Sequence, residues 1–327
     1  MTYLEKQNTD CLKGLCAMAV VVSHLCSQTG IGSSLGLGAV YTALGYLAVS
    51  VFFALSGYGL AFSYNQTGGG YLSSFIRVRV LPIYVLYCSA IVLYAILRLI
   101  MGVDYSLTDL AQSFLFGNTI VPYGWYFQVI ILFYLLFYVA YKYCMKQPLL
   151  FIIAATVVYM IGCGVLGLST TWYECALCFD LGFLFFQKKE AIKGIYESKR
   201  SFVVTCVLSL ILFCICFVLG SKNLVNSSFL TLLFKISSAV LFVVCAFTLV
   251  NRVNLKNKLT EWLSNYYLEI YLFQGMVYIL CRNRFWAVEN QYLYFITAIF
   301  GVLLISKLLH PMTSKLMDAV KRRTLLS

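Results

Sequence analysis

Apolar residues occur along this chain in long runs that are separated by short polar segments. Most of these runs reach the roughly 20 residues that a helix needs to cross a bilayer. The pattern therefore predicts an all-α, polytopic integral membrane protein with about ten transmembrane helices. The expected spans cover residues 11–28, 43–63, 80–102, 125–144, 149–168, 172–187, 201–220, 228–250, 262–281 and 292–310, and the run at 172–187 is the shortest.

Basic residues are distributed unevenly between the two sides that this topology defines. Of the 24 Lys and Arg residues, nineteen fall on the side of the N-terminus, four on the opposite side, and Lys235 within a span. An excess of positive charge marks the cytoplasmic side of a membrane protein, so we expect both termini to be cytoplasmic. The four outer residues are Arg98, Lys222, Arg282 and Arg284.

The composition agrees with a membrane protein, since the 327 residues are 61% hydrophobic and only 11% charged. The net charge of +12 is spread between the apolar runs and forms no single patch, which argues against binding to nucleic acid. We see no linker, no low-complexity tract and no cleavable signal peptide. Residues 1–327 are therefore expected to form one transmembrane domain without an appended soluble domain.

Cysteine is frequent, with 13 residues that lie mostly inside the apolar runs. Cys175 and Cys178 form a CxxC within an apolar run, without histidine or carboxylate ligands at a metal-binding spacing. Small apolar thiols are common in buried helices without further function. We therefore expect no metal site and no disulfide.

The first run carries a lysine at its start and a histidine deep inside it. Lys13 and His24 are eleven residues apart, which places both side chains on one face of a helix and about 16 Å apart along its axis. That distance is about half of a hydrocarbon core. Ionisable groups at this depth usually face a protein interior and are often functional. The alternative is a histidine that only binds a neighbouring helix.

Histidine is the side chain best suited to exchange a proton near neutral pH. His24 is therefore our candidate general base, with Lys13 as a second residue of the site. Glu269 lies about seven residues from the inner surface and is expected near the cavity between Lys13 and His24. The only other histidine, His310, stands before Pro311 at the inner end of the last span, where a structural role is more fitting.

Two arginines stand at the cytoplasmic entrance to the third span. Arg77 and Arg79 precede Pro82 in the segment FIRVRVLPIY. Guanidinium groups bind phosphate oxygens in a bidentate manner, although such residues also serve as simple topological anchors. The preceding span, GYLAVSVFFALSGYGLAF, is rich in small residues that allow helices to approach closely.

These segments together resemble the acyltransferase-3 family of bacterial membrane enzymes. The similarity rests on Lys13-x10-His24, on the GYLAVSVFFALSGYGL helix and on the Phe75 to Pro82 segment. It extends to GWYFQVIILFYLLF (124–137), CFDLGFLF (178–185) and SNYYLEIYLFQG (264–275). The specific part is the first eighty or so residues, and the remaining motifs support it over essentially the whole chain.

The resemblance implies transfer of an acyl group, commonly acetyl, from cytoplasmic acyl-CoA to a sugar hydroxyl of a surface glycan or a lipid-linked precursor. It implies His24 as the catalytic histidine, Lys13 as the basic end of the family motif, and Arg79 and Arg77 as ligands of the CoA phosphates. Acyl-CoA is then a donor substrate and not a resident cofactor. The expected location is the bacterial cytoplasmic (inner) membrane, with the lipid bilayer and a carbohydrate or glycolipid acceptor as partners.

The sequence departs from the family pattern in three places. Gln128 stands where many members have an acidic residue after the Trp of the fourth helix, and Gln274 stands where numerous members have a second histidine. Arg77 is one position away from the commoner arginine spacing. Direct attack by the acceptor hydroxyl is expected, although Ser23 and Ser56 leave an acyl-enzyme intermediate open.

Two aromatic residues, Tyr123 and Trp125, stand at the expected outer end of the fourth span. Their rings could stack on a sugar acceptor and are candidate substrate-binding residues. The alternative is an ordinary aromatic belt, in which Tyr and Trp sit at the membrane interface without contacting a substrate.

A proton-coupled secondary transporter is the strongest alternative function. It would use His24, Asp180, Lys235 and Glu269 as a relay, but no internal repeat typical of transporters is visible. A scaffold or flippase without chemistry would leave the shared face of Lys13 and His24 unexplained. Since Asp180 and Lys235 lie at matched depth, we also expect them to face each other or a shared wet cavity.

Overall fold

The computed structural model describes residues 4–33, 36–115, 120–144, 146–221, 224–283 and 285–323. Within these ranges all regular elements are helical, and pairing between strands is limited to one isolated bridge between Arg282 and Ala287. The predicted all-α class is confirmed. Two of the basic residues assigned to the outer side, Lys222 and Arg284, lie outside the described residues.

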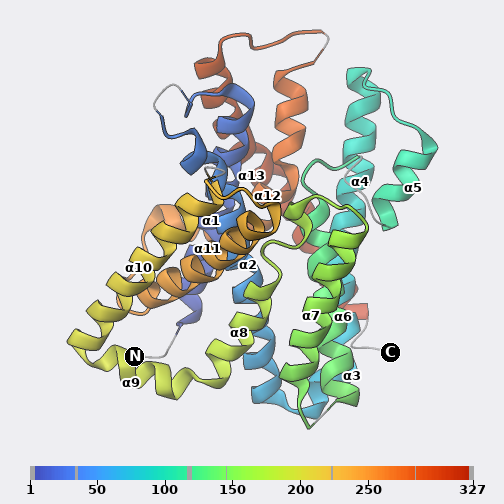
Figure 1. Ribbon diagram of the computed structural model, residues 1–327. Coiled ribbons are helices and arrows are strands. Elements are labelled where there is room, and N and C mark those ends of the chain that lie inside the picture. The colour runs from blue at the N-terminus through green and yellow to red at the C-terminus, as the bar shows by residue number, and fades with distance from the viewer. Residues whose placement is uncertain are drawn as a thin grey trace. The chain divides into compact units, whose positions relative to one another are not determined.

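The first of two compact units comprises Met1–Cys16, Ala43–Gly69 and Val139–Asn265. In this unit α10 and α11 run side by side, and α9 connects α8 to α10 (Figure 1). Many apolar side chains of α10 are exposed in the structure, as expected of a helix that faces lipid. The helices of this unit are α2 (Gly38–Thr67), α7 (Pro148–Val165), η2 (Thr170–Trp172), α8 (Leu177–Gln187), α9 (Lys189–Glu197), α10 (Lys199–Ser221) and α11 (Ser228–Val250).

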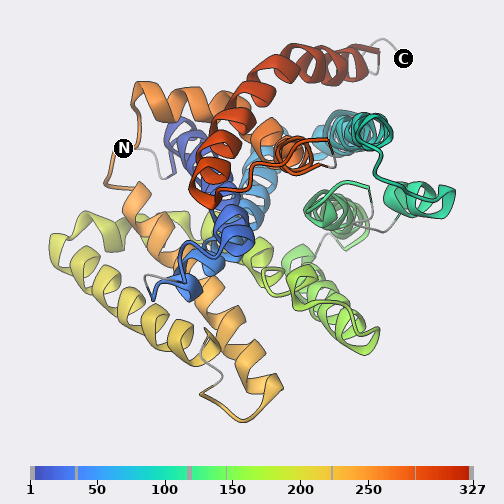
Figure 2. The same ribbon diagram turned by 90° about the horizontal axis from the view of Figure 1, so that it is seen from above.

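The second unit comprises Ala17–Thr42, Gly70–Tyr138 and Tyr266–Ser327. Its longest helix, α13, packs along α4 and the short π-helix η1, and α5 lies beside α4 (Figure 2). Five of the helices that the structure describes are divided between the units: α1 (Lys6–Thr29) and α12 (Lys258–Cys281) begin in the first unit and continue into the second, and α2, α3 and α6 also have residues in both. The other helices are α3 (Gly69–Phe75), η1 (Ile76–Val80), α4 (Leu81–Met101), α5 (Leu107–Leu115), α6 (Trp125–Tyr143) and α13 (Gln291–Arg323).

In the described part of the chain, eight helical segments are long and apolar enough to cross a membrane. They are α1, α2, the continuous stretch from α3 through α4, and α6, α7, α10, α11 and α13. Several apolar helices of this length make the chain a multi-pass membrane protein. The count of ten spans and the cytoplasmic position of both termini stay predictions.

The two other expected spans coincide with α8 and α12, which are not among these eight segments. The run 172–187 contains α8, which has only 11 residues because the chain forms η2 and turns before Leu177. The run 262–281 lies in α12, a helix of 24 residues in which Glu269 and Gln274 interrupt the apolar sequence. The last expected span ends at His310, but α13 continues through Pro311 to Arg323.

Two glycines allow α2 and α8 to pack against each other within the first unit. A Cβ atom at Gly182 would lie 2.0 Å from the carbonyl oxygen of Ala54, and a Cβ atom at Gly57 would lie 2.1 Å from that of Phe179. No side chain fits at either distance. Gly57, one of the small residues of the second expected span, therefore serves helix packing, as such residues do in membranes.

Replacing Gly182 with alanine is expected to destabilise the fold by about 3 kcal/mol, because the methyl group overlaps backbone that cannot move independently. Gly162→Ala in α7 is the matched control, since nothing lies within 4 Å of a Cβ atom there. Thermal unfolding of the purified variants in detergent measures the difference. Equal melting temperatures for the two variants would contradict this close packing.

Candidate active site

His24 lies in α1 at the centre of a hydrogen-bonded cluster within the second unit. Its Nδ1 atom is 2.9 Å from Oε1 of Gln274 on α12. The amide Nε2 of Gln274 donates to the carbonyl oxygen of Tyr271 at 2.8 Å. This bond fixes which end of the amide faces the histidine, because only the nitrogen end can donate to a carbonyl. The Gln274 side chain is fully buried, so its orientation is set by the protein alone.

The contact with Gln274 assigns the proton on the imidazole ring. An amide oxygen only accepts hydrogen bonds, so Nδ1 of His24 carries the hydrogen and donates it. The hydroxyl of Tyr278 lies 3.1 Å from the same Oε1 and supplies a second donor. Nε2 of His24 therefore keeps its lone pair and makes no hydrogen bond to the described residues. Neutral histidine in this tautomer is the form that accepts a proton from a substrate.

The ring of Tyr123 stacks on the His24 imidazole. The ring centroids are 3.5 Å apart and the planes differ by 12°. The backbone of Tyr123 has φ +64°, a left-handed conformation that costs energy in a residue with a Cβ atom. The hydroxyl of Tyr271 donates to the Tyr123 carbonyl at 3.3 Å and supports this conformation. Strained backbone of this kind is typical of functional sites.

A second layer of polar contacts holds Tyr123 in place. Nε2 of Gln28 donates to the Tyr123 hydroxyl at 3.2 Å, and the Tyr294 hydroxyl donates to Oε1 of Gln28 at 2.6 Å. The guanidinium of Arg282 lies 3.9 Å from the centre of the Tyr294 ring. Burial raises the pKa of the Tyr123 phenol. The hydrogen bond from Gln28 lowers this pKa, but burial has the larger effect. Tyr123 is therefore a neutral ring that covers one face of His24.

Lys13 stands earlier in α1 and has a carboxylate partner. Its ammonium group donates to Oδ1 of Asp10 at 2.8 Å. Both side chains are partly exposed, which makes the pair a weak contributor to stability. Sequence reasoning did not name Asp10, although a residue three positions earlier on a helix is a natural partner. The role of Lys13 in the site stays a prediction.

Glu269 is bound by two residues of α13. Its Oε1 atom is 3.0 Å from Nδ1 of His310 and accepts a hydrogen bond of 2.5 Å from the Thr313 hydroxyl. The edge of the Tyr266 ring packs on His310, and Glu269 itself is 2% exposed. The sequence placed Glu269 near His24, whereas the partners in the structure are these α13 side chains. Its catalytic role stays a prediction, and the position of His310 agrees with a structural role.

The arginines at the expected cytoplasmic entrance both lie in η1, a single π-helical turn. The Arg79 guanidinium is 5.8 Å from the centre of the Tyr71 ring. Isolated π-helical turns are rare and occur frequently at functional sites. The other expected sugar-stacking residue, Trp125, is the first residue of α6 and packs edge-on against Tyr126.

The model of the acyltransferase-3 family, described as an acyltransferase domain, matches residues 7–310. The chain belongs to the acyltransferase-3 family. The resemblance based on sequence motifs is thereby confirmed, and the protein is an acyltransferase that is embedded in the membrane. No curated protein and no solved structure gives a significant match.

Several residues of this acyltransferase site could not be assigned from the sequence. Gln274 drew attention only as a departure from the family pattern, and its hydrogen bond to His24 was missed. Gln28 lies four residues after His24, so the helical repeat of α1 was a usable signal for its position on the same face. Tyr278 and Tyr294 gave no signal, because tyrosine is abundant in this chain, with 25 residues.

The family's acidic position is occupied here by an amide that has partners of its own. Nε2 of Gln128 donates to the Tyr87 hydroxyl at 2.9 Å, with the Ser113 carbonyl oxygen at 3.4 Å. In the described ranges, no group of three or more His, Cys, Asp or Glu side chains is arranged to hold a metal ion. All 13 cysteines are free thiols.

The expected direct contact between Asp180 and Lys235 is wrong, and a wet cavity shared by the two residues stays a prediction. Oδ1 of Asp180 accepts a hydrogen bond from Thr156 at 3.0 Å, and no ion pair joins Asp180 to Lys235, although both residues are described. The acid whose charge interacts with the Lys235 ammonium is Glu174, in the turn before α8. Matching depths along the membrane normal did not determine the direction in which each side chain points.

Proposed function

We propose that this acyltransferase moves an acetyl group from cytoplasmic acetyl-CoA to a hydroxyl group of a sugar in a surface glycan or a lipid-linked precursor. The observation that carries the proposal is the state of His24. Its Nδ1–H is held by Gln274 at 2.9 Å, which leaves Nε2 available as a base. The proposed location is the bacterial cytoplasmic membrane.

The proposed reaction is a direct transfer. The acceptor oxygen attacks the thioester carbonyl carbon while Nε2 of His24 removes the hydroxyl proton. The carbon–sulfur bond then breaks, and the CoA thiolate leaves and takes the proton back from the imidazolium. The carbonyl oxygen of Gln274 stabilises the imidazolium by accepting its Nδ1–H. General base catalysis of this kind is worth about 10²–10⁴-fold in rate.

The acyl-CoA donor is proposed to bind with its phosphates at η1. Arg79→Ala is expected to raise the KM for acetyl-CoA roughly tenfold, since a charge-assisted hydrogen bond is worth about 1.5–3 kcal/mol. The kcat should change less, and Arg77→Ala should have a milder effect. Initial rates over a range of acetyl-CoA concentrations measure both constants.

Lys146→Ala is the matched control for these arginine variants, because it removes a basic residue of the same expected side. An Arg77/Arg79 double variant with the KM of the control would show that the arginines serve only as topological anchors.

The remaining predicted residues are proposed to act around this base. Lys13 and Glu269 are proposed as accessory charged groups, and Tyr123 and Trp125 as contacts of the sugar. The stacking of Tyr123 on His24 adds a positioning role to the sugar contact. Acyl-CoA acts in this scheme as a substrate and is not retained between turnovers.

Incubation of the purified protein with labelled acetyl-CoA tests the proposed function. Release of free CoA together with transfer of label to an added saccharide is the expected result. The transporter alternative predicts no consumption of the thioester and instead uptake driven by a pH gradient in proteoliposomes. In the structure His24, Asp180 and Glu269 each bond to a different partner, so no observation favours a relay.

A further inference from the structure

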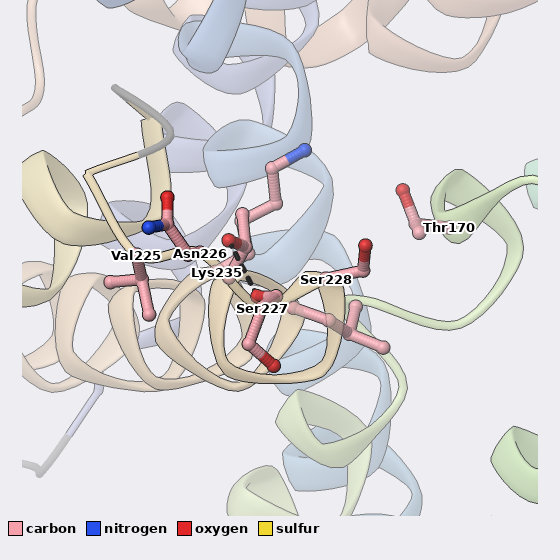
Figure 3. A pocket seen from close by; sticks show the side chains of 8 residues that line it. Thr170, Val225, Asn226, Ser227, Ser228 and Lys235 are labelled. Atoms are coloured by element: carbon pink, nitrogen blue, oxygen red, sulfur yellow. Dashed lines mark hydrogen bonds between the residues drawn. The ribbon is translucent and has the colours of Figure 1, made fainter.

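A polar pocket lies in the first unit at the start of α11. Its volume is about 420 Å³, within the range of roughly 300–1,000 Å³ that is typical of small-molecule sites. The lining comes from η2, from the connection between α10 and α11, and from one face of α11 (Figure 3). Its polar residues are Thr170, Asn226, Ser227, Ser228, Thr231 and Lys235.

Lys235 supplies a positive charge to this pocket. Figure 3 shows its side chain extended from α11, with Asn226 and Thr170 to either side in this view. Its ammonium group makes no hydrogen bond or ion pair within the described chain. The nearby acid, Glu174, is buried with 4% exposure, and its charge interacts with Lys235 from a distance. A buried acid explains how the lysine is tolerated in a membrane protein while its ammonium stays available to a ligand.

The lining offers polar groups that can bind a ligand beside the ammonium. The hydroxyl of Thr231 donates to the Ser227 carbonyl at 3.0 Å and is therefore used. The hydroxyl of Ser228 and the amide of Asn226 have no partner in the described residues, whereas the Thr170 hydroxyl is used in a hydrogen bond to Glu174. Together with the three N–H groups of an ammonium, these free donors favour a ligand that is rich in acceptor oxygens and carries a negative charge.

We propose that this pocket binds a saccharide that carries an anionic group, with the carboxylate or phosphate on Lys235 and ring hydroxyls on Asn226 and Ser228. The volume exceeds what a bare anion requires, and the neutral polar groups suit sugar hydroxyls. The predicted topology places the connection between α10 and α11 on the outer side, where a surface glycan is found. Resting on the proposed function, the bound saccharide would be the acyl acceptor, which makes acidic glycans the proposed substrate class.

Titration calorimetry of the purified full chain in detergent tests the pocket without acyl-CoA. The probes are an oligosaccharide of glucuronic acid, a neutral glucose oligosaccharide of equal length, and glucose 1-phosphate. Both anionic sugars are expected to bind at least about tenfold more tightly than the neutral one. Binding of only one of them identifies the anionic group, and equal affinity for all three probes would overturn the proposal.

Lys235→Met is expected to remove the preference for anionic sugars, whereas Lys235→Arg should largely keep it. Lys193→Met, which removes an exposed lysine of α9 in the same unit, is the matched control and should bind as the unchanged chain does. Should Lys235→Met not fold, Asn226→Ala and Ser228→Ala replace it, each with an expected loss of about three- to tenfold. Unchanged binding in these variants would also overturn the proposal.

The failure of this inference can be distinguished from failure of the proposed function. His24→Ala is expected to lose acetyl transfer and to bind the acidic saccharide normally. A chain that consumes acetyl-CoA but shows no preference for anionic sugars would overturn the pocket alone. A chain that binds them but never consumes acetyl-CoA would overturn the transfer reaction alone.

Discussion

Replacing His24 with alanine is expected to lower the rate of acetyl transfer by about 10²–10⁴-fold, the usual contribution of a general base. The substitution removes the imidazole whose Nδ1 is held by Gln274 and whose Nε2 makes no hydrogen bond to any residue that the structure describes. The variant should still insert and accumulate, because the ring contributes one stacking contact and one hydrogen bond to a large helical assembly. Transfer of label from acetyl-CoA, measured beside membrane abundance, gives the result.

The control for this experiment is Cys16→Ala, a small change at a buried position of the same helix. It should leave the transfer rate close to that of the unchanged chain and so exclude a general disturbance of α1. Activity near the original level in His24→Ala would remove the histidine as the base and leave the proposed reaction without a proton acceptor.

Gln274→Leu is expected to reduce kcat by about 10²-fold, on the scale of misplacing a catalytic group by about 1 Å. Leucine has nearly the same size but cannot accept the proton of Nδ1, so the ring is free to rotate and to take the other tautomer. The substitution leaves Arg77 and Arg79, the proposed ligands of acetyl-CoA, unchanged. The KM for acetyl-CoA should therefore stay constant. Steady-state kinetics separate the two constants.

Gln274→Glu serves as the matched variant for this prediction, since it keeps an acceptor oxygen toward His24. It is expected to retain most of the activity that the leucine variant loses. A role of Gln274 in packing alone would instead affect both variants through protein abundance and melting temperature. Full kcat in Gln274→Leu would contradict the assignment of the histidine tautomer.

The helical class was readable from the sequence for physical reasons, and the same reasons made His24 a candidate. Long apolar runs require helices in a bilayer, and a fixed angle per residue places Lys13 and His24 on one face. The boundaries of α8 were not readable, because an apolar run does not reveal that the chain turns through η2 before the helix begins.

The partners of the charged residues were the least predictable part of the site. His24 and Gln274 are 250 positions apart, and Glu269 and His310 are 41 positions apart. Such pairs depend on which helices are neighbours and on how each helix is rotated. Depth in the membrane constrains neither quantity, which is why Asp180 and Lys235 were wrongly paired. The tautomer of His24 could be assigned only from the orientation of the Gln274 amide, which its hydrogen bond to the Tyr271 carbonyl fixes.

The positive φ of Tyr123 has a consequence for efforts to engineer this protein. Glycine or asparagine would adopt that backbone conformation more easily than tyrosine, so a search for heat-resistant variants will favour them at this position. Each would remove the ring that covers His24 and leave the imidazole less constrained. Selection for stability alone is therefore expected to inactivate the enzyme first at residue 123, and position 123 should be held fixed in any such library.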